Sequence, residues 1–198
     1  MSILEASVLC LSFLLGSIPF GILIGRLRGV DIRSEGSGNI GATNAIRSMG
    51  VGPGLIVCFL DALKGAIPVV LAKMYLDNAT LFVYVGLLAI LGHIFSPWVK
   101  FKGGKGAATG LGVLFGMDYM LASGTLFVFV LTFFVSGKRV SVGSMVAATL
   151  QALIVWFLPD PPLAEKILCT FIALFIVIRH KDNIRRLLGG KEAPLKLP

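Results

Sequence analysis

The sequence predicts an all-α integral membrane protein, organised as a single polytopic domain over residues 1–198 with about seven transmembrane helices, one of them short. Three features of the composition predict this class. Hydrophobic residues make up 56% and charged residues 14% of the chain, whereas soluble domains contain about 25% charged residues. The mean hydropathy is +0.91. The 24 glycines suit helices that pack closely in lipid.

Apolar runs follow one another along the chain and define the expected spans. A helix needs about 20 residues to cross the hydrocarbon core, and most of the runs approach that length. The run at 107–117 is shorter, at about 16 Å of helix with the usual rise. We expect spans at Ile3–Ile24, Val51–Ala72, Thr80–Val99, Ala107–Met117, Tyr119–Val135, Ser141–Leu158 and Leu163–Ile178.

Basic residues fall in alternate loops. They follow the first, third and fifth runs and fill the tail, whereas the turns near Asp77, Asp118 and Asp160 contain none. The positive-inside rule therefore predicts an outside N-terminus and a cytoplasmic C-terminus, provided that the 107–117 run crosses the membrane. Because the cations lie beside apolar runs, the net charge of +8 fits a membrane surface or small anions better than nucleic acid.

A polar stretch, SGNIGATN at 37–44, lies between the first two runs and is followed by an arginine. Glycines let a backbone approach a ligand closely, exposed N–H groups suit an anion, and an arginine can clamp one with two bonds. An ordinary tight turn between membrane helices is the alternative, because these residues are common turn formers. The candidate residues are Ser37, Asn39, Gly41, Thr43, Asn44 and Arg47.

A glycine-rich basic loop follows the third run. Lys105 lies among Gly103, Gly104 and Gly106, and a helix is expected to begin directly after them. The lysine charge, the loop N–H groups and the positive end of the helix dipole would attract an anion. The loop lacks the spacing and the Ser or Thr of a Walker A motif. A basic loop that touches lipid headgroups is the alternative.

A third polar group comes from the C-terminal part of the chain. His180 and Asn183 begin the tail directly after an apolar run, and Ser141 and Ser144 lie one helical turn apart at the start of another. His180 is suited to be a general base or a phosphate donor. The alternatives are a tail that follows the positive-inside rule and serines that cap or pack a helix.

Ionisable residues also lie within the apolar runs. Asp61 and Lys64 share one helical face, and His93 lies near the end of the third run. Such residues are costly in lipid, so a functional role in support of the site stands beside a mutually neutralising structural pair. For His93, an interhelical hydrogen bond is the alternative.

The residue inventory contains no nucleophile elbow, carboxylate pair or metal-ligand cluster, and the three cysteines show neither metal-ligand spacing nor a disulfide framework. Neither histidine is followed by an acid at the spacing of a His-x4-Asp dyad. The sequence therefore predicts positioning and charge stabilisation rather than covalent catalysis, with no metal ion.

The polar stretches together resemble a known family. SGNIGATN (37–44), GH (92–93) with FKGGKG (101–106), and RHKDNIRR (179–186) resemble the three signature stretches of the bacterial acyl-phosphate:glycerol-3-phosphate acyltransferases (PlsY). DALKG (61–65) resembles the second-span element of that family. The resemblance covers essentially the whole chain, in order.

The resemblance implies an inner-membrane enzyme of phospholipid synthesis with its site on the cytoplasmic face. It would move a fatty acyl group from acyl phosphate to the sn-1 hydroxyl of glycerol 3-phosphate, giving lysophosphatidate and phosphate. Acyl-CoA, acyl carrier protein, cofactors and metals would take no direct part, and a partner enzyme would make the acyl phosphate. Ser37, Lys105, His180 and Asn183 are the expected catalytic residues.

The expected division of labour follows from this chemistry. The polar stretch at 37–44 would cradle the acyl-phosphate headgroup, and the remaining groups would grip glycerol 3-phosphate and the reacting phosphate. Either His180 or the leaving phosphate would accept the hydroxyl proton. We favour the phosphate because the sequence offers His180 no obvious carboxylate orienter except Asp182, which is two positions away and would not face it on a helix. The residues expected to grip glycerol 3-phosphate and the reacting phosphate are Arg47, Lys105, Ser144, His180 and Asn183.

A transporter or channel for phosphate-like anions is the competing class. It explains the apolar bundle and the basic loops. It does not explain why the polar stretches share one predicted membrane face, because a transport path needs polar groups through the membrane.

Overall fold

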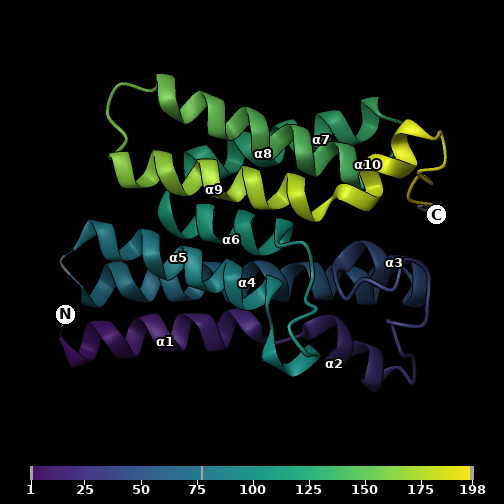
Figure 1. The fold of residues 1–198 in the computed structure, drawn as a ribbon, viewed down its shortest axis with the longest axis horizontal. Coiled ribbons are helices and arrows are strands. Elements are labelled where there is room, and N and C mark those ends of the chain that lie inside the picture. The colour runs from purple at the N-terminus through teal and green to yellow at the C-terminus, as the bar shows by residue number, and fades with distance from the viewer. Residues whose placement is uncertain (1, 77, 197–198) are drawn as a thin grey trace. The chain divides into compact units, whose positions relative to one another are not determined.

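The computed structural model describes residues 2–76 and 78–196, and its regular elements in that part are helices (Figure 1). This confirms the predicted all-α class. The chain divides into two compact units, one ending at Asp118 and the other beginning at Tyr119. Each unit is described by itself. Asp77, which we expected in a turn, lies outside the described residues.

The first apolar run forms a broken helix rather than the expected continuous span. Helix α1 covers Ile3–Ser17 and helix α2 covers Phe20–Leu27, with a bend of 43° between them. Pro19 lies at the break, where its ring removes a backbone donor and disfavours helical geometry at the preceding residue. At the break the Leu15 carbonyl still accepts from the Ile18 amide over 3.2 Å, and the Ile18 carbonyl accepts from the Phe20 amide over 3.1 Å.

The polar stretch after α2 contains a helix that its composition did not indicate. Helix α3 covers Ala42–Met49, and Gly50, with φ of 88°, separates it from the long helix α4. A positive φ is accessible to glycine at little cost, which allows the chain to turn between the two helices. The other elements of the first unit are α4 (Val51–Tyr75), α5 (Ala79–Ile94), the 3-10 turn η1 (Pro97–Val99) and α6 (Ala107–Met117).

Helices α4 and α6 approach each other backbone to backbone (Figure 1). A Cβ atom on Gly112 would overlap the Ala62 carbonyl, and one on Gly65 would overlap the Thr109 carbonyl. Small residues permit such close packing in membrane helices. At the far end of α6, Lys73 from α4 donates to the Met117 carbonyl over 2.9 Å. The short helix is therefore fixed along its length.

The second unit contains an antiparallel arrangement of three apolar helices and one short basic helix. Helix α7 packs against α8, and α8 packs against α9. After α10 the chain returns, and the Leu195 amide donates to the Lys138 carbonyl in the α7–α8 loop over 2.8 Å. The elements are α7 (Tyr119–Val135), α8 (Val140–Phe157), α9 (Leu163–Arg179) and α10 (Lys181–Leu188).

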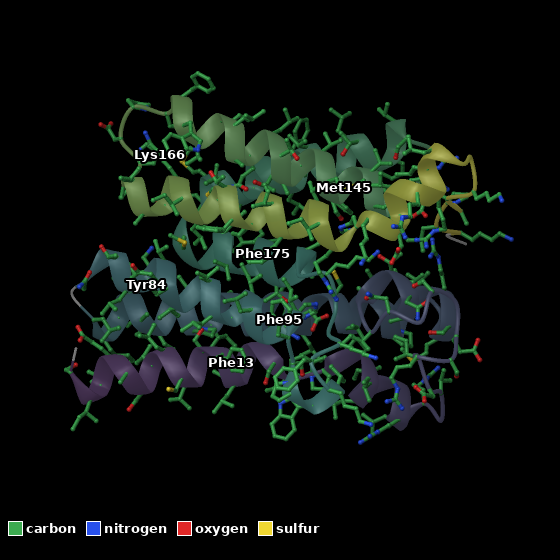
Figure 2. The ribbon with its side chains drawn as sticks, viewed as in Figure 1. Phe13, Tyr84, Phe95, Met145, Lys166 and Phe175 are labelled. Atoms are coloured by element: carbon green, nitrogen blue, oxygen red, sulfur yellow. The ribbon has the colours of Figure 1, made fainter. Side chains whose placement is uncertain are left out.

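Several helical segments are long and apolar enough to cross a membrane. By length and hydropathy these are Val51–Tyr75, Thr80–Val99 and Val140–Phe157, and the bent α1–α2 pair passes the same criterion as one span. Helices α6 and α7 are apolar but shorter. Large apolar side chains such as Tyr84 and Phe95, which are labelled in Figure 2, are exposed, as expected of a surface in contact with lipid. The expected count of about seven spans and the orientation of the termini stay predictions.

Candidate active site

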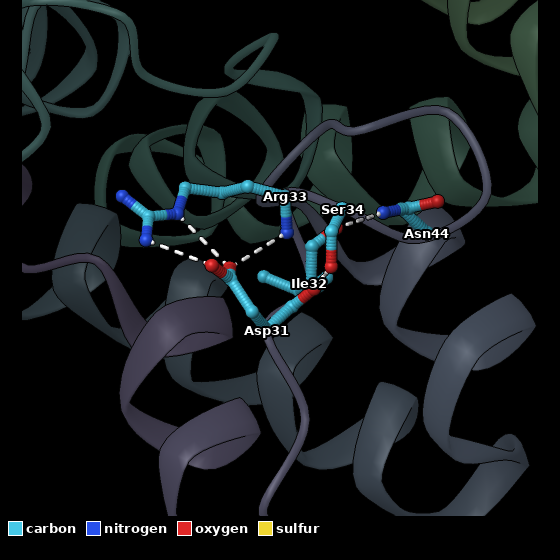
Figure 3. A network of polar contacts seen from close by, with 5 residues as sticks. All are labelled: Asp31, Ile32, Arg33, Ser34 and Asn44. Carbon is cyan, nitrogen blue, oxygen red and sulfur yellow. Dashed lines mark hydrogen bonds and ion pairs between the residues drawn. The ribbon is translucent and has the colours of Figure 1, made fainter.

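Asn44 organises the polar stretch of the first unit. Its amide nitrogen donates to the carbonyls of Ile32 (2.8 Å) and Glu35 (3.0 Å), and Figure 3 shows the first of these bonds. Its oxygen accepts from the amide (2.7 Å) and the hydroxyl (3.2 Å) of Ser37. The side chain is buried and uses both its donors and its acceptor capacity within the chain. Asn44 therefore shapes the loop, and direct substrate binding by it stays a prediction.

An exposed ion pair supports the same loop (Figure 3). Arg33 donates to both carboxylate oxygens of Asp31, over 3.0 and 2.9 Å, and its backbone amide also donates to Asp31. The side-chain hydrogen bonds from Arg33, aided by the bond from its amide, lower the pKa of Asp31 to about 2. The pair therefore stays ionised and stabilises the turn at residues 31–33, before Ser37.

Of the remaining residues, Asn39 and Gly41 precede α3, Thr43 lies in its first turn and Arg47 lies in its last turn. Asn39 accepts from the amide of Gly41 over 2.9 Å, which forms a turn directly before the helix. Thr43 and Arg47 follow at a spacing of four residues, so they share one face of α3. Ser37 and Arg47 are exposed. The first turn of α3 thus carries Thr43 and a dipole end that favours an anion, and Arg47 lies one turn further along.

A small apolar core connects the polar stretch to the second loop of this unit. Val99, which ends η1, packs against this core. It lies six residues before Lys105 along the chain. Both predicted anion-binding loops are thus attached to one apolar cluster of the first unit. The core residues are Ile22, Ile32, Ile40, Ala45 and Val57.

The glycine-rich loop is docked on the end of α5. The Gly103 amide donates to the Ile94 carbonyl over 3.0 Å, and the Gly104 amide donates to the His93 carbonyl over 3.2 Å. A Cβ atom on Gly104 would overlap the His93 imidazole. We expected these glycines to free their amides for an anion. The structure shows instead that both amides bind α5, so glycine is required at 104 for close packing.

Lys105 is placed at the start of a helix, as the sequence predicted. Gly106 adopts a φ of 83°, and α6 begins at Ala107. Lys105 is half-buried. Its charge therefore lies beside the first turn of α6, where unpaired N–H groups and the helix dipole attract anions. Contact of Gly103, Gly104 or Gly106 with substrate stays a prediction.

The in-span residues of the first unit form a buried cluster. Lys64 Nζ lies 2.7 Å from Asp61 Oδ1, and His93 Nδ1 lies 3.8 Å from the same oxygen. All three residues are buried, with 2%, 5% and 4% exposure for Asp61, Lys64 and His93. The structure thus brings these expected support residues together.

In the second unit, His180 lies between α9 and α10 with its ring fixed by the backbone. Its Nδ1 is 2.7 Å from the Ile176 carbonyl, one turn earlier in α9. A carbonyl only accepts hydrogen bonds, so Nδ1 must carry the hydrogen, and Nε2 of the neutral ring is then the acceptor. The sequence showed no orienter for His180, whereas the structure supplies this carbonyl.

Glu192 joins two of the expected site residues of this unit. Its Oε1 accepts from the Ser141 hydroxyl over 2.8 Å and from the Asn183 amide over 2.6 Å. Its Oε2 accepts from Arg186 over 2.7 Å. Ser141 comes from α8 and Asn183 from α10, so one carboxylate fixes these two helices together. Ser144 is also buried, one turn beyond Ser141.

The Glu192 carboxylate is held in its ionised form. Burial opposes ionisation, but the hydrogen bonds from Asn183, Arg186 and Ser141 outweigh burial and lower the pKa of Glu192. Sequence reasoning missed Glu192, because a single acid in a basic tail is usually a solvent-exposed charge. Its only signal was its position directly after Gly189, Gly190 and Lys191. In residues 2–76 and 78–196, no group of three or more His, Cys, Asp or Glu side chains converges as a metal site would require.

The family model described as glycerol-3-phosphate acyltransferase matches residues 6–190. A glycerol-3-phosphate acyltransferase of Trichlorobacter lovleyi is 44% identical over 186 residues, which are 93% of this chain and 94% of the relative. One from Aquifex aeolicus is 41% identical over 182 residues, which are 91% and 94% of the two chains.

Solved structures agree with these relatives. The crystal structure of PlsY (YgiH), an integral membrane glycerol 3-phosphate acyltransferase, in its glycerol 3-phosphate form has a TM-score of 0.91 and 37% identity, and the match covers 97% of this chain and 96% of that one. Its lysophosphatidic acid form has a TM-score of 0.88 at the same identity, over 96% and 94% of the two chains. The chain is therefore a multi-pass membrane protein that belongs to the glycerol-3-phosphate acyltransferase family.

Proposed function

We propose that this protein transfers a fatty acyl group from acyl phosphate to the sn-1 hydroxyl of glycerol 3-phosphate. Lysophosphatidate and inorganic phosphate are the products. The observation that carries the proposal is the placement of Lys105 in a glycine loop at the start of α6, in a chain of this family. Both proposed substrates carry a phosphate group, which the Lys105 charge and the N-terminus of α6 would attract.

The chemistry of an acyl phosphate matches the groups present. The sn-1 oxygen attacks the acyl carbonyl carbon, a new ester C–O bond forms, and the bond between that carbon and the phosphate oxygen breaks. The mixed anhydride already has a good leaving group. The enzyme therefore has to align the reactants and offset the charge on the oxygens, for which Arg47 and Lys105 supply cations.

Ser37, with the turn at Asn39 and the first turn of α3, is proposed to receive the acyl-phosphate headgroup. Lys105 and Arg47 are proposed to hold the reacting phosphate and glycerol 3-phosphate. His180, Asn183 and Ser144 complete the glycerol 3-phosphate site in this proposal. Ser141 and Asn183 owe their position to Glu192, because both donate to its carboxylate.

The proton of the attacking hydroxyl passes to the leaving phosphate in this proposal. A phosphate dianion, whose conjugate acid has a pKa of about 6, is a usable base. The fixed tautomer of His180 leaves Nε2 suited to accept a hydrogen bond from a substrate hydroxyl and so to orient it. If His180→Ala abolished turnover while calorimetry showed unchanged glycerol 3-phosphate binding, His180 would be the base instead.

The protein is proposed to work in the bacterial inner membrane as one polytopic domain, with its site facing the cytoplasm. A separate enzyme would supply the acyl phosphate. The loops that hold Lys105 and His180 would then lie on the same side of the membrane. Labelling of single cysteines placed in the loops before α6 and after α9 with an impermeant maleimide, in intact cells and inverted vesicles, tests this orientation.

Product formation in detergent tests the proposal against anion transport. Purified protein is given glycerol 3-phosphate with palmitoyl phosphate or with palmitoyl-CoA, and lysophosphatidate is quantified. We expect lysophosphatidate with palmitoyl phosphate as donor and none with palmitoyl-CoA. Chemical analysis of the product should place the ester at the sn-1 position. Transport has no meaning without a membrane, so a well-folded protein that forms no product with either donor would contradict the acyltransferase. Product from palmitoyl-CoA would contradict the proposed donor.

A further inference from the structure

The break in the first span is capped by a lysine from another helix. Lys64 Nζ, on α4, donates to the carbonyl of Ile18 over 2.7 Å and lies 5.6 Å from the centre of the Phe20 ring. The Ile18 carbonyl also accepts from the Phe20 amide over 3.1 Å, but it lacks the regular helical bond, and lipid offers no further donor. Lys64 thus supplies a second, charged donor where Pro19 interrupts the helix.

The same lysine is bound to the carboxylate that faces His93. Asp61 Oδ1 lies 2.7 Å from Lys64 Nζ and 3.8 Å from His93 Nδ1. The opposite edge of the His93 ring packs against the backbone of Gly104, where a Cβ atom would overlap Nε2. His93 therefore lies between the buried carboxylate and Gly104. Gly104 directly precedes Lys105 in the glycine-rich loop.

A second set of bonds joins the break to the segment that leads into the loop. The Ser96 hydroxyl donates to the Ser17 carbonyl over 2.6 Å, and the Trp98 indole N–H donates to the Ser17 hydroxyl over 2.9 Å. Ser17 ends α1, while Ser96 and Trp98 lie between α5 and the loop. The broken span and the segment before the loop are thus joined by two hydrogen bonds to Ser17, in addition to the contacts of Lys64 and Asp61.

We propose that Lys64 and Asp61 are positioning residues for Lys105. The pair fixes the end of α1, the His93 ring and the Gly103–Gly106 loop relative to one another. A merely neutralising pair would need only its own two charges. Here Lys64 also holds the Ile18 carbonyl, and Asp61 also faces His93. The role in turnover rests on the proposed function, whereas the effect on the loop does not.

A matched pair of lysine variants tests the proposal in the full-length protein. Lys64→Met keeps the length of the side chain and removes its donors. Lys73→Met makes the same change on the same helix, at a lysine that also donates to backbone carbonyls, those of Gly116 and Met117. We expect at least a tenfold loss of kcat/KM for palmitoyl phosphate in Lys64→Met and less than a twofold loss in Lys73→Met.

Amide hydrogen exchange measures the loop without any substrate. We expect faster exchange in peptides covering residues 100–106 in Lys64→Met and unchanged exchange there in Lys73→Met. Equal exchange in that peptide across wild type and both variants would overturn the proposal. If wild type shows no turnover, the proposed function fails and exchange still decides the positioning role.

The double variant Asp61→Asn/Lys64→Met covers the case in which Lys64→Met fails to fold. It removes both charges with little change of shape, so no buried charge is left alone. We expect folded protein with kcat/KM at least tenfold below wild type and faster exchange at residues 100–106, because methionine cannot donate to the Ile18 carbonyl. Wild-type kcat/KM and exchange in the double variant would show that the pair only neutralises itself.

Discussion

The side-chain amide of Asn183 donates a hydrogen bond of 2.6 Å to the carboxylate of Glu192. The hydroxyl of Ser141, which comes from a different helix, donates to the same oxygen. The short basic helix α10 is therefore attached to α8 through a buried acid near the end of the chain. Two residues expected to serve the site depend on it for their position.

Replacement of that acid should destabilise the second unit. In Glu192→Gln, one carboxylate oxygen becomes an NH₂ group that faces a donor, and the charge-assisted bonds are lost. We expect the free energy of unfolding to fall by about 2 kcal/mol, which is typical for a hydrogen bond to a charged group. Thermal denaturation in detergent measures this. Glu35→Gln, at an exposed acid, is the control. Equal losses in the two variants would contradict the account.

The same carboxylate should make stability depend on pH. The pKa of Glu192 is lower in the folded protein than the ordinary value of 4.5. Its contribution is therefore complete above pH 4.5 and is lost as the pH falls through the folded-state pKa. We expect the melting-temperature difference between wild type and Glu192→Gln to be constant above about pH 5.5 and to shrink below pH 4.5. A difference independent of pH down to the acid limit of folding would contradict this.

Replacement of the side-chain amide nitrogen of Asn44 should reduce both activity and stability. Asn44→Asp keeps the shape but places a carboxylate oxygen against the carbonyls of Ile32 and Glu35. Buried carbonyls that lose their donors cost about 1–3 kcal/mol each. We expect at least a tenfold loss of acyltransferase activity and a lower melting temperature.

Asn78→Asp is the matched control for Asn44→Asp. Asn78 uses only its side-chain oxygen, which accepts from the Thr80 amide at the start of α5. Aspartate keeps that bond and favours a helix N-terminus, so activity and stability should stay near wild type. Equal behaviour of the two variants would contradict the role assigned to Asn44.

Gly104 should be irreplaceable for steric reasons. In Gly104→Ala the new methyl group would overlap the His93 ring, so the loop would have to leave the end of α5. We expect at least a tenfold loss of kcat/KM. Gly52→Ala adds the same methyl group where no atom beyond its own helical turn lies within 4 Å, and it should leave kcat/KM unchanged. Full activity of Gly104→Ala would show that the docked loop is not the active form.

The helical class and most helix positions follow from the apolar runs, because a membrane span needs a long apolar stretch whatever its neighbours. The start of α6 was also predictable, since Gly106 ends an irregular loop. Pro19 was visible in the sequence, but we predicted one continuous span through it. Local sequence could not show that its carbonyls would be capped from α4.

The missed features depend on contacts between residues far apart in the chain or on backbone geometry. Helix α3 is polar and short, so no apolar periodicity marks it. Glu192 gains its importance from Ser141, 51 residues away. The amides of Gly103 and Gly104 looked available for an anion, but the end of α5 accepts from both. Composition identifies candidate residues, whereas only the packing shows which groups are already used.

The central claim is tested most directly by phosphate release from palmitoyl phosphate, with and without glycerol 3-phosphate. The assay compares wild type, Lys105→Gln and, as control, Lys100→Gln at an exposed lysine of the same loop region. We predict acceptor-dependent release by wild type and Lys100→Gln and at least a hundredfold loss, about 2.7 kcal/mol of transition-state stabilisation, in Lys105→Gln. Acceptor-dependent release that survives in Lys105→Gln, or none from well-folded wild type, would contradict the account.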